Sequence, residues 1–136
     1  MFSNNDLYPV IDLMPSQPSN DAVYIPNKLA PQYLFNDLDE EEAKKWAAEL
    51  LPISTNHQAQ TIANSCWSSR IPKIYISSDE DLALWPKTQQ RMLDQVRDST
   101  WSTTRQISSG HSPFLSQPGA LAELLIEIAE GWSART

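Results

Sequence analysis

Residues 71–84 read Ile71-Pro-Lys-Ile-Tyr-Ile-Ser-Ser-Asp-Glu-Asp-Leu-Ala-Leu84 and decide the fold class. The run over residues 73–77 is rich in β-branched and aromatic side chains, which favour a strand, and Pro72 is tolerated where a strand begins. Three acidic residues at positions 79–81 follow this run at once. The stretch therefore predicts a strand that ends in an acidic loop.

A helix, a second strand and a last helix follow the acidic loop. Residues 86–96 predict a helix, because a proline suits its first turn and its apolar side chains lie on one side. Residues 103–108 predict the second strand, 109–113 a loop and 118–132 the last helix. The apolar faces of the two helices hold Met92, Leu93 and Val96, and Leu121, Leu124, Leu125, Ile128 and Trp132. Strands joined through a helix of about ten residues are expected to be parallel neighbours, which is typical of an α/β protein.

A carboxylate and an imidazole follow the two predicted strands. Asp81, or alternatively Asp79, comes after the first strand, and His111 comes after the second. In open α/β sheets the functional side chains lie beyond the carboxyl ends of the strands. Parallel strands would therefore bring the two groups together as a general base and the acid that orients it. The alternative is that both are solvated loop residues without a catalytic role.

The first part of the chain differs from the rest in its proline content. Residues 1–35 hold five of the ten prolines, which interrupt regular structure, so we expect an extended or partly disordered lead-in. A helix then begins with Asn36 or Asp37 as its cap, and Pro52 ends it. Acidic residues 39–42 fall in its first turns, where the helix dipole favours them, and we interpret them as a solvated face rather than a metal site.

Glycine is scarce, and this scarcity excludes several kinds of site. The chain has three glycines, Gly110, Gly119 and Gly131, and none in its first 109 residues. Loops that cradle phosphate or turn sharply beneath a nucleophile use glycine, because a Cβ blocks close approach and positive φ. The sequence therefore lacks the dinucleotide fingerprint, the P-loop and the Gly-x-Ser-x-Gly nucleophile elbow.

Charge and cysteine content exclude further classes of protein. Ten basic residues against 17 acidic ones give a net charge of −7, which repels a nucleic-acid backbone. No apolar run is long enough to span a membrane, and residues 1–10 do not resemble a secretory signal. One cysteine and two histidines form neither an internal disulfide nor a four-ligand zinc site. We therefore expect a cytoplasmic protein that uses no metal or cofactor and binds no nucleic acid or membrane.

Three spaced motifs carry a family resemblance: residues 71–84, Gln89-Gln-Arg-Met92 and Gly110-His-Ser-Pro-Phe-Leu-Ser-Gln-Pro118. Together they resemble the C-terminal half of α/β-hydrolases, closest to the branch that contains methylesterases and hydroxynitrile lyases. In that family the acid of the catalytic triad precedes a helix that begins with proline, which matches Asp81. The base lies in a Gly-His-Ser-Pro-Phe-type loop, which matches His111. The resemblance therefore implies that these two residues are the catalytic acid and base.

The end of the cap that covers the pocket in these proteins is similar to Leu34-Phe-Asn-Asp-Leu-Asp39, followed by Ala43 and Trp46-Ala-Ala48. The resemblance implies a partial α/β-hydrolase fold: a short parallel sheet with flanking helices and a cap-like helical segment. Three regions follow from it, namely the lead-in over residues 1–35, the cap-like segment over 36–70 and the C-terminal half of the fold over 71–136.

The resemblance also implies parts that this sequence does not contain. In the family a serine or cysteine nucleophile on an elbow, and an oxyanion-hole loop, precede the acid and the base. Cys66 precedes Asp81 and His111, but no glycine flanks it in Asn64-Ser-Cys-Trp-Ser-Ser69, so we interpret it as a buried free thiol. The chain is therefore expected to be truncated and not competent for serine hydrolysis alone.

Three functions are consistent with these residues. The first is an ester, lactone or thioester hydrolase of small-molecule metabolism, acting on a small apolar, ester-like or polyketide-like substrate. The second is a non-catalytic hydrolase remnant that acts as a binding partner. The third is a lyase or cyclase without a nucleophile, in which His111 and Asp81 transfer a proton.

Self-association is a further expectation. The sheet of the family continues into strands that this sequence lacks, so Ile74, Tyr75 and Ile107 are expected to be exposed. An exposed sheet edge could then pair with a second copy of the chain.

Overall fold

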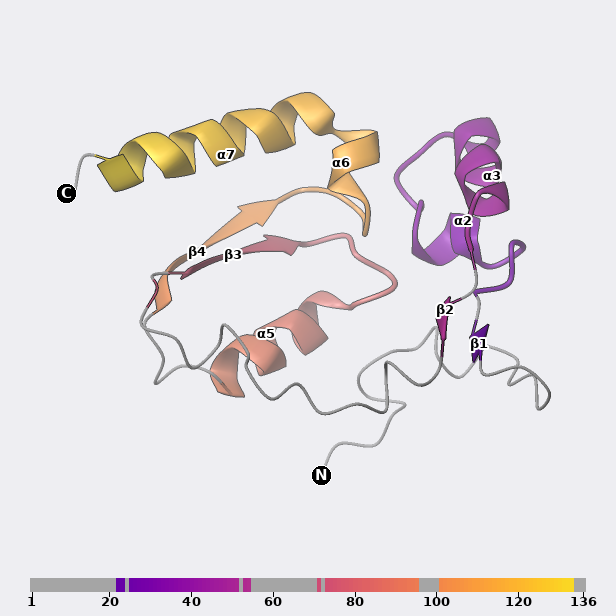
Figure 1. Ribbon diagram of the computed structural model, residues 1–136, viewed down its shortest axis with the longest axis horizontal. Coiled ribbons are helices and arrows are strands. Elements are labelled where there is room, and N and C mark those ends of the chain that lie inside the picture. Colours follow the sequence, from indigo (N-terminus) through magenta and orange to yellow (C-terminus); the bar gives the residue numbers. More distant parts are fainter. Residues whose placement is uncertain are drawn as a thin grey trace.

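Two parallel strands with a helix on each side form the centre of the computed structural model (Figure 1). The structure describes residues 22–23, 25–51, 53–54, 71, 73–95 and 101–133. Strand β3 spans Lys73–Ser78 and β4 spans Trp101–Ile107, and α5, Pro86–Gln95, lies between them along the chain. The predicted order of strand, helix and strand is confirmed, and so is the parallel pairing.

The pairing of β3 and β4 brings the loops after the two strands side by side. After one irregularity at the start of β3, the register continues to its last pair, Ser78 opposite Ile107. Beyond the strands, the main-chain N of Asp79 donates to the carbonyl oxygen of Ile107 (3.2 Å), and that of Glu80 donates to Ser109 O (3.0 Å). Both loops therefore leave the sheet at the same edge.

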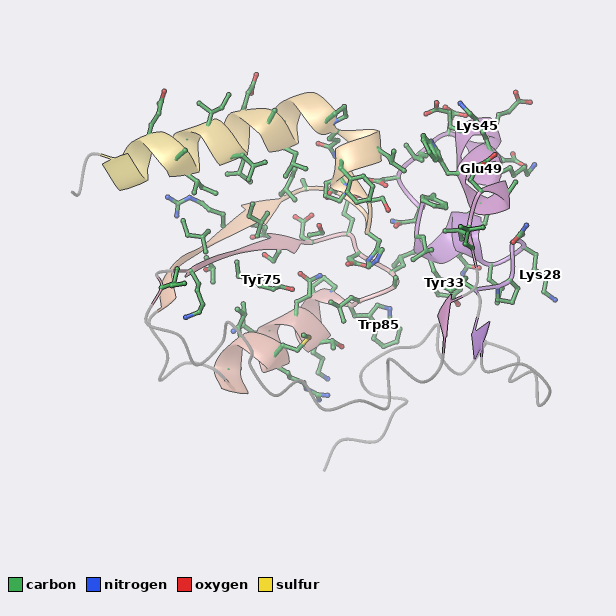
Figure 2. All side chains as sticks on the ribbon, viewed as in Figure 1. Lys28, Tyr33, Lys45, Glu49, Tyr75 and Trp85 are labelled. Atoms are coloured by element: carbon green, nitrogen blue, oxygen red, sulfur yellow. The ribbon has the colours of Figure 1, made fainter. Side chains whose placement is uncertain are left out.

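Helices α5 and α7, Pro118–Ser133, cover opposite faces of the sheet (Figure 1). The last helix thus forms where the sequence predicts it, and a short helix α6, Pro113–Ser116, precedes it. Figure 2 shows Tyr75 on the side of the sheet that faces α5, where its hydroxyl donates to Gln89 Oε1 (3.4 Å). None of the helices in the described part of the chain combines the length and the apolarity needed to cross a membrane.

The buried side chains among those described on α5 are polar. Thr88 and Gln89 are buried, whereas Met92 and Leu93 are half-buried. On α7 the predicted apolar face is half-buried, except that Leu125 is exposed. A sheet of two strands covers only one strip of each helix, which leaves the rest of each apolar face open. Two members of the predicted faces lie outside the description, Val96 and the side chain of Trp132.

Residues 25–51 form a helical segment beside the carboxyl ends of β3 and β4 (Figure 1), called here the N-terminal helical segment. It contains α2, Ala30–Tyr33, and α3, Glu40–Ala48. A short antiparallel pair, β1 (Ala22–Val23) with β2 (Ile53–Ser54), flanks it along the chain. Helix α2 lies where an extended lead-in was expected, because a proline in its first turn favours a helix start. Residues 1–21 and 24 of the lead-in lie outside the described ones.

The cap of α3 is Asp39, which corrects the prediction of Asn36 or Asp37. One carboxylate oxygen of Asp39, Oδ1, accepts hydrogen bonds from the main-chain N of Glu41 (3.1 Å) and of Glu42 (3.0 Å). A side chain that satisfies free amides of the first turn is the usual reason for aspartate at this position. Asn36 and Asp37 are thereby left for other contacts.

The acidic start of α3 faces solvent, as the sequence predicts. Glu40, Glu41 and Glu42 are all exposed and occupy the first turn. Lys44, one turn further along, forms a hydrogen-bonded ion pair with Glu40, and this contact lowers the pKa of the Glu40 carboxyl. The interpretation of this run as a solvated helix face is confirmed.

The apolar core of the described residues lies mainly within the N-terminal helical segment. Its buried members are Ala30, Phe35, Ala43 and Ala47, and Leu115 of α6 packs against them. Because Leu115 follows the His111 loop, this core ties the N-terminal helical segment to the half of the molecule that contains the sheet.

The apolar side chains of the sheet are better covered than expected. Ile107 is buried, and Ile74 and Tyr75 are half-buried, so the expected exposure of Ile107 is wrong. Among the described residues, the large exposed apolar side chains lie on helices and loops instead: Leu51, Ile71, Leu82, Trp85, Phe114, Leu125 and Ile126.

Overpacking the core at Ala47 should destabilise the fold. Ala47 is buried in the same cluster as Phe35, and extra methylene groups strain a packed core, so Ala47→Leu is expected to lower the free energy of unfolding by ~1–3 kcal/mol. Ala48→Leu, on the exposed side of the same helix, is the matched control and should change it by less than about 0.5 kcal/mol. Urea unfolding followed by circular dichroism measures both, and equal midpoints for the two variants would contradict this core.

Candidate active site

Asp81 lies in the loop between β3 and α5, and its carboxylate is buried. One carboxylate oxygen, Oδ1, accepts hydrogen bonds from the main-chain N of Ala83 and of Leu84, both at 2.8 Å. This turn leads directly into α5. Because an ionised carboxylate only accepts hydrogen bonds, two amide donors on one oxygen suit it and fix the orientation of the side chain.

The buried side chain of Gln89 connects the end of β3 with the Asp81 loop. Its Nε2 donates to the carbonyl oxygens of Ser78 (3.0 Å) and Leu84 (2.8 Å) and lies 3.5 Å from Asp81 Oδ2. Its Oε1 accepts from the main-chain N of Ser78 (3.2 Å). Gln89 belongs to the Gln89–Met92 motif, which carried no predicted role for this side chain. A polar residue on the sheet-facing side of an amphipathic helix was the available signal.

His111 follows β4, and its ring meets the carboxylate of Asp81. The Nδ1 atom lies 2.9 Å from Asp81 Oδ2 and 3.1 Å from Oδ1. The side chain of His111 is 37% exposed and that of Asp81 is 6% exposed, so the acid is covered while the base is reachable. A carboxylate oriented in this way requires the Nδ1 proton as its donor, which leaves Nε2 to accept a proton. The predicted contact of these two side chains, called here the acid–base pair, is confirmed.

Asp79, the alternative acid, points away from the imidazole. Its Oδ2 accepts hydrogen bonds from the Gln106 side chain (Nε2, 3.2 Å) and from the hydroxyl of Ser108 (3.1 Å). Both partners belong to β4 or the residue after it, so Asp79 fastens the ends of the two strands to each other. The geometry therefore assigns Asp81, and not Asp79, to His111.

Two side chains of the N-terminal helical segment also reach these loops, and sequence reasoning missed them. Asn36 Nδ2 donates to the carbonyl oxygen of Glu80, and Asp37 Oδ2 accepts from the main-chain N of Gly110. Their positions before an acidic run indicated a helix cap, and nothing local indicated contacts with distant loops.

Among the described residues we identify neither a nucleophile nor a cluster of metal ligands. Cys66 lies outside them, so its interpretation as a buried thiol stays a prediction. Ser109 and Ser112, on either side of the Gly110–His111 peptide, are buried, and the hydroxyl of Ser109 donates to Gly110 O (3.1 Å). Within the described ranges no three His, Cys, Asp or Glu side chains converge as a metal site requires.

Taken together, the fold and the acid–base pair define an α/β protein with a histidine oriented by a buried carboxylate at the carboxyl edge of a parallel sheet. No protein-family model matches the chain. Methylesterase 7 from Arabidopsis thaliana is 32% identical over 123 residues, which are 88% of this chain and 46% of that protein.

Two solved structures with a similar fold are forms of one esterase. Polyneuridine aldehyde esterase aligns with a TM-score of 0.65 at 20% identity, over 85% of this chain and 47% of that chain. A point mutant of that enzyme aligns with a TM-score of 0.66 at 17% identity, over 85% and 46%. The chain thus spans about half the length of the proteins that it matches. It has part of the α/β-hydrolase fold that these structures share.

The carboxylate of Asp81 should determine which ring nitrogen of His111 carries the proton. In Asp81→Asn the carboxamide can donate to Nδ1 instead of accepting from it, so the neutral ring is expected to change to the Nε2–H tautomer. Long-range ¹H–¹⁵N NMR spectra of the labelled chain measure this change. Asp79→Asn, which alters a carboxylate that does not contact the ring, should leave the tautomer unchanged; the same change in both variants would contradict the assignment.

Proposed function

We propose that Asp81 and His111 are the acid and the base of an ester-hydrolysing active site of the α/β-hydrolase type, in the methylesterase and hydroxynitrile lyase-like branch. The observation that supports this most is the 2.9 Å contact between Asp81 Oδ2 and His111 Nδ1, with the acid covered and the base reachable. The acid and base thus have the separate environments that their two roles require.

The chemistry proposed for the pair is general acid–base catalysis. Nε2 of His111 takes the proton of a serine hydroxyl as that oxygen attacks the ester carbonyl carbon, and it later gives this proton to the departing alcohol oxygen. Asp81 stays ionised, orients the ring through Nδ1–H and stabilises the imidazolium that forms. The pair of glycines that a nucleophile elbow requires is not found at any serine of this sequence. We therefore propose that another polypeptide segment supplies the serine, its elbow and the oxyanion donors.

Apolar side chains on both loops of the site support a small apolar, ester-like or polyketide-like substrate. Leu82 and Trp85, in the Asp81 loop, are 40% and 43% exposed, and Phe114, shortly after His111, is 62% exposed. Pockets for small ligands are lined mainly by such side chains. The names of the similar proteins, a methylesterase and an aldehyde esterase, support an ester as the reacting group.

The remaining functional expectations stay predictions. We place the protein in the cytoplasm, and we propose that it self-associates through a sheet edge. A non-catalytic remnant and a proton-transferring lyase or cyclase are the alternatives to ester hydrolysis, and no described contact favours either of them.

A chimera tests the proposed function. In it, this chain replaces the 46% of Methylesterase 7 that it matches, and the retained part of that protein is expected to supply the nucleophile. The chimera is expected to hydrolyse a short activated ester, and His111→Ala should lower kcat by a factor on the order of 10⁶. Asp79→Asn is the matched control and should retain activity, because its partners lie on β4 and not on the imidazole. A folded chimera that is inactive, or one whose activity survives His111→Ala, would refute the proposal.

The 136-residue chain alone should not turn over short activated esters above background. Without a nucleophile it has no covalent route, and removal of a single oxyanion donor already costs a factor of roughly 10²–10³ in rate. His111→Ala should therefore change nothing in this assay. Ester turnover that is abolished by His111→Ala but not by Cys66→Ala would instead identify a serine of this chain as the nucleophile.

A further inference from the structure

Two consecutive residues between α2 and α3 bind the main chain directly before each member of the acid–base pair. Asn36 Nδ2 donates to the carbonyl oxygen of Glu80 (3.0 Å), one residue before the acid. Asp37 Oδ2 accepts from the main-chain N of Gly110 (2.7 Å), one residue before the base. The N-terminal helical segment therefore contacts the residue directly before the acid and the residue directly before the base.

Asp37 holds the histidine loop on both sides of His111. Besides the Gly110 amide, the hydroxyl of Ser116 at the end of α6 donates to the same Oδ2 atom (2.6 Å). Hydrogen bonds to a carboxylate are shorter and stronger than those between neutral groups. One carboxylate oxygen thus fastens the start and the end of the short stretch that contains His111.

Gly110 is a glycine because of this contact. A Cβ at this position would lie 2.5 Å from Asn36 Oδ1 and 2.6 Å from Asp37 Oδ1, closer than real Cβ contacts allow. These two oxygens are buried and have no hydrogen-bond partner among the described residues. No described glycine has a positive φ, so close approach, and not backbone conformation, requires glycine here.

We propose that Asp37, supported by Asn36, is a positioning residue that sets where His111 stands relative to Asp81. This inference rests on the proposed function, because it concerns the geometry of the acid–base pair that function would use. Asp37 acts through the main chain of Gly110 rather than by contact with the ring. The packing of the N-terminal helical segment against the two loops then determines whether His111 Nδ1 contacts Asp81 Oδ2.

The physical reason is the directionality of the contact between the two side chains. The imidazole and the carboxylate belong to different loops, and a hydrogen bond between them weakens steeply when its angle or length changes. If the amide of Gly110 moves away from Asp37, the neighbouring His111 ring moves with it while Asp81 stays held by its own amides. The contact between Nδ1 and Oδ2 is then lost without unfolding of either loop.

NMR on the full 136-residue chain tests this inference. Asp37→Ala removes both hydrogen bonds on Oδ2, so it is expected to cause loss of the His111 Nδ1–H resonance and faster hydrogen exchange at the Gly110 amide. Asp37→Asn, which keeps the size and an acceptor oxygen but not the charge, should give a partial loss. Gly110→Ala, which pushes against the same two side chains, should reproduce the effect of Asp37→Ala.

Asp39→Ala is the matched control for a general loss of stability. It removes the cap of α3 in the same segment, but Asp39 binds Glu41 and Glu42 and not the two loops. Exchange in α3 should become faster while the His111 Nδ1–H resonance stays unchanged. Gly119→Ala, with nothing within 4 Å of the added Cβ, is the corresponding control for Gly110→Ala.

Two results would overturn the inference. One is an unchanged Nδ1–H resonance in Asp37→Asn and Gly110→Ala, and these two variants decide the question if Asp37→Ala does not fold. The other is an equal loss in Asp39→Ala, which would mean that only stability is affected. Either result leaves the proposed function standing, since that function is refuted separately by a chimera whose activity survives His111→Ala.

Discussion

The buried carboxylate of Asp81 is the constraint on which the arrangement of both loops depends. A charged group removed from water is costly unless hydrogen-bond donors surround it. Here two main-chain amides of its own loop and the ring of His111 meet its two oxygens, and the amide of Gln89 lies 3.5 Å away. These donors belong to the loop after β3, to α5 and to the loop after β4. Satisfying one carboxylate therefore fixes three elements relative to one another.

The sheet and the acid–base pair could be predicted from the sequence because both depend on local patterns. A strand over residues 73–77 followed by a helix from Pro86 predicts a crossover to a parallel strand. The loops that follow two parallel strands then lie at the same edge of the sheet. The residues alone left Asp79 open as an alternative to Asp81. What separates them is the pairing beyond the end of β3, which turns Asp79 towards Ser108 and is visible only once the strands are in register.

The contacts of Asn36 and Asp37 could not be predicted, because the local signal indicated a different role. Both are good helix caps in front of an acidic run, yet Asp39 takes that position. Their partners lie 44 and 73 residues away along the chain, and contacts at such separations produce no periodicity. The one sequence signal of these contacts was Gly110. In a chain with three glycines, a glycine directly before His111 indicates close approach of another segment.

The orientation of the acid–base pair depends on contacts that lie within the described residues, and none of these contacts involves a nucleophile. The amides that hold Asp81, the side chain of Gln89 and the carboxylate of Asp37 all act on the two loops themselves. A base that is oriented before substrate binds has already met the entropic cost of its alignment. Orientation of the base and supply of the nucleophile are thus separate physical requirements. A chain can therefore hold the acid and the base in a productive arrangement and still depend on another segment for turnover.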